Sequence, residues 1–247
     1  MPSEVRSISA ALVERKDGQL ACFPYARGRL NGRRAIVAVT GVGVTNGAMV
    51  SALFINAFAP AQVIVSGTGS RFNPRVRTGD TVISTKTIHH AAGSLTNDGM
   101  VYRKVRGPLT GAMTAWFYKP DPALFALARA SIAGYEANEI TVDGLRYRPA
   151  VFPGVVTASD LFGVSDEKIA DMQSKLQPDI MEMESAAIAQ VCHQLATPHI
   201  VFRAGSNRTQ SNPGNDYRRL GQIAAAAAAR WTMYFVGCLA AREAGAR

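Results

Sequence analysis

The chain has 247 residues, 47% of them hydrophobic, with 22 glycines and 12 prolines. This composition excludes a disordered or collagen-like chain and predicts one compact domain over residues 1–247. The 27 lysines and arginines exceed the 18 acidic residues and give a net charge of +9. They are scattered, without interleaved aromatic residues or a recognition helix, so a nucleic-acid partner is not predicted.

The cysteines lie far apart, at Cys22, Cys192 and Cys238. This spacing indicates neither a disulfide framework nor a zinc site, so we expect a protein without metal in a reducing, cytoplasmic compartment. Residues 1–15 have no apolar core followed by a small-residue cleavage site, so no signal peptide is expected.

Residues 220–241 form the longest apolar stretch, but Gln222 and Arg230 interrupt it. An arginine at the centre of a bilayer costs about 2.5–3.5 kcal/mol on insertion scales. We therefore predict a buried helix here and no membrane partner. The alanine run at 224–229 favours a helix and permits close packing on a sheet.

Short apolar runs predict strands along the chain. Val63-Ile64-Val65 has no polar alternation, which is typical of a strand buried on both faces. The predicted strands cover residues 35–39, 63–66, 81–84, 154–157 and 199–202.

Helical spacing of apolar residues separates these strands and predicts an α/β fold. Residues 45–58 carry this spacing and end before Pro60, so strands 35–39 and 63–66 are expected to form a βαβ unit around a helix. A second helix is predicted over 184–195. Residues 90–148 are rich in Gly, Pro and charge, and predict long loops plus a helix around 122–134.

Two glycine-rich turns follow predicted strands. Gly41-Val42-Gly43 precedes a helix whose N-terminus favours an anion. It lacks the third glycine of a dinucleotide fingerprint, and no suitable acidic residue follows within about 20 residues, so a dinucleotide site is not predicted. Ser66-Gly67-Thr68-Gly69-Ser70 suits an anion or a sugar, or is a simple turn.

The densest polar feature is Met181-Glu182-Met183-Glu184, where two carboxylates meet the junction of a predicted strand and helix. Glu184 could be only a favourable partner for the helix dipole. However, ligands of α/β proteins bind where strands end, and the two oxygens of one carboxylate can accept both hydroxyls of a ribose.

Together with Arg77-Thr78-Gly79-Asp80 and Arg203-Ala204-Gly205-Ser206-Asn207, these motifs resemble the nucleoside phosphorylase superfamily in order and spacing. The likeness is greatest to the methylthioadenosine/S-adenosylhomocysteine nucleosidases and spans roughly residues 8–242. It implies a three-layer fold, in which helices flank both faces of a central mixed sheet. It also implies a homodimer that needs no cofactor and acts on a small nucleoside.

The resemblance assigns roles to individual residues. It implies that Glu184 holds the ribose hydroxyls, that Met183 packs beneath the sugar and that Phe162 stacks on the base. The segment from Ser9 to Glu14 resembles one whose last glutamate activates the attacking water, so Glu14 is the expected general base, an exposed glutamate being the alternative. Further substrate contacts are expected from Thr68, Gly69, Ser70, Glu182, Arg203 and Ser206.

Asn207 departs from the nucleosidase pattern, which has an aspartate that donates a proton to the departing purine. Loss of a general acid typically costs 10²–10⁴-fold. The stretch Arg208-Thr209-Gln210 resembles uridine phosphorylases, but their pyrimidine-binding stretch is missing near Phe162. The base therefore stays open, and Asn207 favours a 6-oxopurine because an amide offers both a donor and an acceptor.

The second substrate is expected to be water. The phosphorylases carry an N-terminal Gly-Asp-Pro-x-x-Arg segment that is absent here, and an arginine where this chain has Val65. Gly43 and Arg71 remain as candidate phosphate contacts. We expect hydrolysis, with a phosphate-dependent phosphorylase and a nucleoside-binding protein without turnover as the alternatives.

Overall fold

The computed structural model describes residues 2–108, 111–113, 116–209 and 214–245; Gln210 lies outside them. In chain order the elements are α1 (Pro2–Ala10), β1 (Val13–Leu20), β2 (Phe23–Leu30), β3 (Arg33–Ala38), α2 (Val44–Phe58), β4 (Val63–Arg71), β5 (Thr81–His89), β6 (Gly93–Thr96), β7 (Gly99–Tyr102), β8 (Phe117–Tyr118), α3 (Pro122–Ser131), the 3₁₀ helix η1 (Ile132–Gly134), β9 (Ile140–Val142), β10 (Leu145–Tyr147), β11 (Val151–Ala158), α4 (Asp166–Lys175), β12 (Ile180–Glu182), α5 (Ser185–Gln194), β13 (His199–Arg208) and α6 (Gly214–Gly245).

The central sheet has six strands in the order β11-β12-β4-β13-β5-β8. β4 and β13 are parallel, whereas β12 runs antiparallel to β4 and β5 antiparallel to β13. β11 pairs with β12 on one side and with β5 on the other, so these strands close into a ring. The predicted mixed sheet is confirmed.

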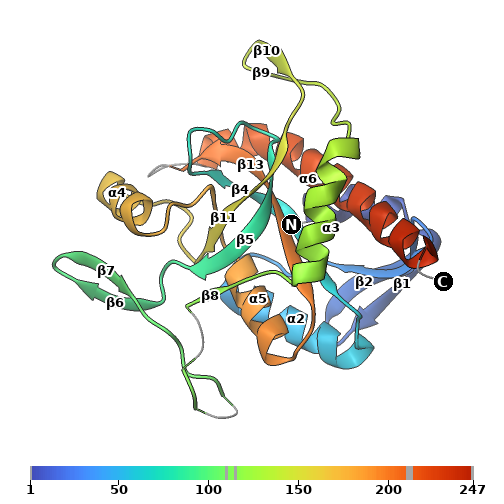
Figure 1. The fold of residues 1–247 in the computed structure, drawn as a ribbon, viewed down its shortest axis with the longest axis horizontal. Helices are drawn as coiled ribbons and strands as arrows, with labels where there is room; N and C mark the ends of the chain where they lie inside the picture. Colours follow the sequence, from blue (N-terminus) through green and yellow to red (C-terminus); the bar gives the residue numbers. More distant parts are fainter. Residues whose placement is uncertain (1, 109–110, 114–115, 210–213, 246–247) are drawn as a thin grey trace.

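Helices cover both faces of this sheet, as predicted (Figure 1). Val65 and Val201 pack against α2 and α5. Ile200 and Phe202 pack against α3 and α6, around Trp231. Because successive side chains of a strand point to opposite faces, these apolar runs are buried on both sides.

The long helix α6 is packed against the sheet along its alanine run. Ala224 and Ala228 form a cluster with Ala204 of β13, and small side chains let the helix axis approach the strands closely. By length and composition alone α6 could cross a membrane, but half of its most apolar window is buried inside the molecule. A buried helix is therefore found where one was predicted.

The βαβ prediction for strands 35–39 and 63–66 is wrong. β3 pairs with β2 and belongs to a separate three-stranded sheet, β1-β2-β3. Asn31 and Gly32 connect β2 to β3, and both have positive φ, which is the geometry of a two-residue type I′ hairpin. This local turn directs β3 to its sequence neighbour and away from β4.

The region 90–148 contains more regular structure than predicted. It holds the hairpins β6–β7 and β9–β10 and the short strand β8. The expected helix is found as α3 and η1, and Asp121 caps α3 by accepting from the N–H groups of Ala123 and Leu124. Both hairpins project from the body of the molecule (Figure 1).

Candidate active site

Short segments from several elements enclose a hollow of about 240 Å³. They come from β4, β12, β13, the loop after β11, and the starts of α1, α2 and α6. The described lining consists of Glu4, Gly41, Val42, Thr68, Gly69, Ser70, Leu161, Phe162, Met181, Glu182, Met183, Glu184, Arg203, Ser206, Asn207 and Tyr217.

Most of the site residues expected from the sequence line this one hollow. They are Thr68, Gly69, Ser70, Phe162, Glu182, Met183, Glu184, Arg203, Ser206 and Asn207. Glu14, Gly43 and Arg71 are not part of the lining. The gathering of residues from positions 68 to 207 is what a common binding site requires.

Arg203 is the buried centre of the charged groups. Its Nη2 lies 2.6 Å from Glu182 Oε2 and 3.1 Å from Glu184 Oε2. Its Nε donates to the Ser185 hydroxyl at 3.0 Å, and its Nη1 to the Thr68 carbonyl at 3.2 Å. The arginine compensates buried carboxylates, which would otherwise be very costly, and so organises the site.

The two glutamates of the Met181–Glu184 motif have different environments. Glu182 accepts from the N–H of Glu184 at 2.9 Å and from the N–H of Ser185, so it caps the start of α5. Burial, opposed by the Arg203 guanidinium and reinforced by the Glu184 carboxylate, raises the pKa of Glu182 to about 7. Glu182 therefore positions Arg203 and α5, and Glu184 is the carboxylate held between Arg203 and α2.

The start of α2 holds Glu184 from the other side. Gly43 donates its N–H to Glu184 Oε1 at 3.0 Å, and Asp160 Oδ1 accepts from the Val44 N–H at 2.8 Å. Gly43 has φ 101°, and a Cβ there would lie 2.6 Å from Asp160 Oδ1, so only glycine fits. Because its N–H is bonded to Glu184, Gly43 is not available as the expected phosphate contact.

Glu14 does not occupy the position expected of a general base. It lies on β1, pairs with Arg29 at 3.6 Å and keeps 71% of its side chain exposed. Glu4 of α1 lies in the hollow instead, and its Oε1 accepts from the N–H and the hydroxyl of Thr68 at 2.7 and 2.9 Å. The sequence held a signal for this, because Glu4, Ile8 and Leu12 are spaced to share one face of a helix.

The charge state of Glu4 suits a base. Burial would raise the pKa of its carboxyl, but nearby positive charge, to which the Arg203 guanidinium contributes most, outweighs burial, so the pKa lies below its ordinary value. A Cβ on Gly67 would lie 2.4 Å from Arg203 Nη1 and 2.9 Å from Glu4 Oε1. A side chain at position 67 would collide with both groups, so glycine there lets Arg203 and Glu4 lie close to the backbone of β4.

Aromatic and apolar side chains form the mouth of the hollow. Phe162 is 47% exposed, and Tyr217 of α6 stands edge-on to it, with ring centroids 6.1 Å apart at 88°. Val42 and Leu161 lie beside them. The sequence reading missed Tyr217, although its spacing to Leu220 and Ala224 indicates an inward-facing helix position.

Asn207 lies at the buried end of the hollow, 1% exposed. Its Nδ2 donates to the Arg208 carbonyl at 2.9 Å, and its Oδ1 lies 3.0 Å from the Ser206 hydroxyl. Because the Arg208 carbonyl can only accept, the end of the Asn207 amide that faces it must be the nitrogen. Asn207 therefore holds its own loop while it also lines the hollow.

Arg71 lies away from the hollow, contrary to its expected role as a phosphate contact. Its neighbour Ser70 lines the hollow, and alternation along β4 directs Arg71 to the other side. There its Cγ lies 2.7 Å from where a Cβ of Gly205 would be, next to Val76.

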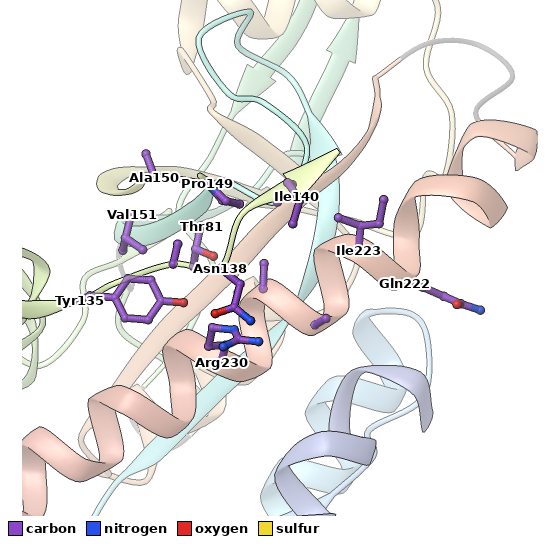
Figure 2. Close-up of a pocket in the computed structure, with 14 residues that line it drawn as sticks. Thr81, Tyr135, Asn138, Ile140, Pro149, Ala150, Val151, Gln222, Ile223 and Arg230 are labelled. Atoms are coloured by element: carbon purple, nitrogen blue, oxygen red, sulfur yellow. The ribbon is translucent and has the colours of Figure 1, made fainter. Parts of the chain in front are cut away.

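A larger hollow of about 350 Å³ lies beside α6, between η1, β9 and the start of β11. Figure 2 shows Asn138 and Arg230 beside one another in it, with Tyr135 nearby. Its described lining holds no carboxylate and none of the residues expected from the sequence. Of these two hollows, as far as their described lining goes, the first is the one that holds carboxylates.

Among the described residues, no cluster of three or more His, Cys, Asp or Glu side chains could hold a metal ion.

The chain is similar in sequence and fold to proteins named as nucleosidases. The 5'-methylthioadenosine/S-adenosylhomocysteine nucleosidase of Geobacillus thermodenitrificans is 33% identical over 209 residues, covering 84% of this chain and 80% of that protein. The Geobacillus kaustophilus nucleosidase is 30% identical, covering 91% and 88%. The crystal structure of the Neisseria meningitidis nucleosidase with methylthio-immucillin-A has a TM-score of 0.82 at 28% identity, covering 96% and 95%. The phosphorylase superfamily model matches residues 1–237, and the chain belongs to this superfamily as an enzyme of its nucleosidase branch.

Proposed function

We propose that this chain hydrolyses the N-glycosidic bond of a purine nucleoside or 5'-thio-nucleoside, releasing the free base and the ribose moiety. The observation that carries the proposal is the hollow itself, where Glu4 and Glu184 flank buried Arg203 and Phe162 stands at the mouth. The names of the relatives as nucleosidases, and a solved relative from Colwellia psychrerythraea bound to adenine, support a purine.

The proposed reaction begins with departure of the base. Positive charge develops on the ribose, and the Glu184 carboxylate stabilises it through the sugar hydroxyls. Gly43 and Arg203 hold that carboxylate in place before the reaction, so little reorganisation is needed. Glu4, ionised because its pKa is lowered, takes a proton from the water that attacks the anomeric carbon.

The leaving base is held by Phe162 and Asn207. Asn207 uses one of its two Nδ2 hydrogens on the Arg208 carbonyl, and the second can reach a base in the hollow. An amide donates a hydrogen bond but not a proton, so the base leaves as an anion with the electron pair of the glycosidic bond and takes its proton from solvent water. The proposal therefore gives Asn207 a binding role toward a 6-oxopurine in place of general acid catalysis.

Water is favoured over phosphate by the charges of the lining. Arg203 is the one cation among the described lining residues, and both Glu182 and Glu184 are paired with it. A phosphate dianion would need a cation that is not already neutralised.

The deciding experiment is a panel of inosine, guanosine, adenosine and 5'-methylthioadenosine, incubated with and without phosphate and assayed for free base. We expect base release that phosphate does not increase. Release only with phosphate would show a phosphorylase, and tight nucleoside binding without product would show a binding protein.

We also propose that the enzyme is a homodimer. The family resemblance implies this assembly, and α2 offers an apolar face for it. Tyr25 covers part of that face, because it packs against Phe54 and Phe58. Met49 and Leu53 remain exposed on α2, close in sequence to the mouth of the hollow. Sedimentation at micromolar concentration should give twice the 26.3 kDa monomer mass; a monomer alone would contradict this.

A further inference from the structure

The larger hollow, beside α6, has one wall that hydrogen bonds fix in place. This wall consists of residues 79–81 and 149–151. The Thr81 N–H donates to the Ala150 carbonyl at 2.8 Å, and the Ala150 N–H donates to Asp80 Oδ1 at 2.7 Å. At about 350 Å³, the hollow falls within the range of about 300–1,000 Å³ that is usual for small-molecule sites. It is therefore a preformed space of the size that a small ligand needs.

The opposite wall is the side of α6 that carries Ile223, Ala226 and Ala227. The two alanines have small side chains, so the space between the helix and the first wall stays open. Water against such a surface finds few hydrogen-bond partners, and an apolar group gains by displacing it. The interior therefore favours the apolar part of a ligand. Further apolar residues of the lining are Ala137, Ile140, Pro149 and Val151.

The charge of the hollow comes from one side chain. Arg230 is the only charged residue of the described lining, which contains no carboxylate to neutralise it. Figure 2 shows the Tyr135 hydroxyl turned toward the part of the hollow where Arg230 lies. Burial, opposed by the Arg230 guanidinium, raises the pKa of Tyr135, so its phenol is protonated at neutral pH and can donate. An apolar space with a cation and a neutral donor at one side matches a ligand with one negative charge.

We propose that this hollow binds a small carboxylic acid whose apolar body is a single ring. The planar guanidinium of Arg230 matches the two oxygens of a carboxylate, and the ring lies against Ile223 and Ala226. A nucleoside is not the ligand, because it is neutral and the described lining has no carboxylate to accept its ribose hydroxyls. The described linings of the two hollows share no residue, so this second site does not depend on the proposed function.

The first test is calorimetric titration of the protein with benzoate, phenylacetate and 3-phenylpropionate. We expect saturable binding of at least one of these acids. Its neutral amide, which keeps the shape, and acetate, which keeps the charge, should each bind about tenfold or more weakly, because each lacks half of the interaction. If none of the three acids binds, or if the amide binds as well as its acid, the inference is wrong.

Variants then locate the ligand. Arg230→Gln should weaken binding of the acid about tenfold to a hundredfold, the value of a hydrogen-bonded contact between charged groups. Its matched control is Arg242→Gln, which removes an exposed arginine of α6 outside this lining and should bind the acid as the wild type does. Ala226→Trp fills the hollow from an exposed position and should abolish binding. Phe162→Ala alters the first hollow and should leave binding of the acid unchanged.

Three results would overturn the inference. Full binding by folded Arg230→Gln or Ala226→Trp would show that the acid lies elsewhere. Loss of binding in Phe162→Ala would place it in the first hollow. A change of sedimentation from dimer to monomer in Arg230→Gln or Ala226→Trp would show that a second copy of the chain covers this surface. None of these results bears on base release, so the proposed function is tested separately.

Discussion

The surroundings of Asn207 determine what an acid could do at this position. Its Nδ2 faces the Arg208 carbonyl, and its Oδ1 faces the Ser206 hydroxyl. A carboxylate in the same place would set one oxygen against a carbonyl oxygen, and this repulsion would be relieved by protonation. The loop is therefore suited to an amide or to a protonated acid.

We expect Asn207→Asp to shift the enzyme toward adenine release. A protonated aspartic acid can turn its single hydrogen from the Arg208 carbonyl to the five-membered ring of the purine, and general acid catalysis contributes about 10²–10⁴-fold. Base release from 5'-methylthioadenosine should rise relative to release from inosine. Asn138→Asp makes the same substitution in the lining of the other hollow and should leave the ratio as it is. An unchanged ratio in a folded Asn207→Asp enzyme would remove the leaving-group role.

Glu4 and Glu14 offer a matched comparison, because only one lies in the hollow. Glu4→Gln should lower kcat about 10²-fold or more, since the amide cannot take a proton from water. Glu14→Gln changes an exposed side chain and should leave kcat unaltered. Steady-state kinetics of both variants, with circular dichroism to confirm folding, decides between them. Loss of activity in Glu14→Gln with full activity in Glu4→Gln would reverse the assignment.

Glu184→Gln tests the electrostatic part of the mechanism. Glutamine keeps the shape of the side chain, and its oxygen can still accept from Gly43 or Arg203, but the negative charge opposite the developing cation is lost. We expect kcat to fall about 10²–10³-fold with a small change in KM. Near-normal turnover by the folded variant would be incompatible with a carboxylate that stabilises the ribose.

Several residues of the site were predictable because each lies in a short motif where chemistry and position coincide. Glu182 and Glu184 are acids at a strand-to-helix junction. Thr68 and Ser70 lie in a glycine-rich segment that was expected to be a turn and that the structure shows to be part of β4. The structure places Glu14 outside the hollow; the expectation for it rested on a match of a few residues and ignored which helix face is buried. The partners of Glu4 are distant in sequence, so only the fold brings them together.

At the scale of elements, α2 depends on another segment for its start. It has no side-chain cap of its own, and Asp160, from the loop after β11, accepts from the Val44 N–H. The same loop carries Phe162. The first residue of this loop, Ser159, is also fixed, because its hydroxyl lies 2.7 Å from Nε2 of buried His90 and accepts from the Leu161 N–H.

Asp160→Ala should therefore weaken both stability and binding. Loss of a cap costs about 1 kcal/mol, which urea denaturation will measure, and KM should rise because the loop with Phe162 loses its anchor on α2. Asp160→Asn can still accept the Val44 N–H and serves as the conservative control. Equal destabilisation by both variants would show that loss of the hydrogen bond to the Val44 N–H does not cause the loss of stability.

The elements that the sequence reading missed were governed by turn chemistry. β2 and β3 form a hairpin through Asn31 and Gly32, a dipeptide that strongly favours a two-residue turn. Their half-exposed strands lack the continuous apolar runs that identified β4 and β13. The pairing of β11 with both β12 and β5 depends on contacts across the whole chain, and no local pattern encodes it.

At the scale of the whole molecule, a buried histidine makes stability depend on pH. His199 is 6% exposed, and burial, opposed by Asp121, lowers the pKa of its imidazole to about 4. The unfolded chain binds a proton near pH 6.5, whereas the native state binds it only near pH 4. The contribution of His199 is thus present above pH 6.5 and is lost as the pH falls toward 4.

His199→Asn removes this dependence. The difference in free energy of unfolding between wild type and His199→Asn should shrink by up to about 3 kcal/mol between pH 7 and pH 4. Taking the difference cancels contributions common to both proteins, such as that of Glu182. Urea denaturation across this range provides the measurement, and a constant difference would show that His199 is not a neutral buried group.

The alanine run of α6 limits how this sequence can drift during evolution. Ala224, Ala225, Ala228 and Ala229 are at most 3% exposed, and Ala224 and Ala228 lie against the strand that carries Arg203 and Asn207. A larger side chain on this inner stripe would push the helix outward and move the start of α6, with Tyr217, relative to the hollow. Ala226 and Ala227 line the larger hollow beside it. Substitutions in descendants of this chain should therefore recur with the period of the helix. Positions on the outer side of α6 are free to vary without disturbing this packing, whereas the four buried positions should keep a side chain no larger than a methyl group.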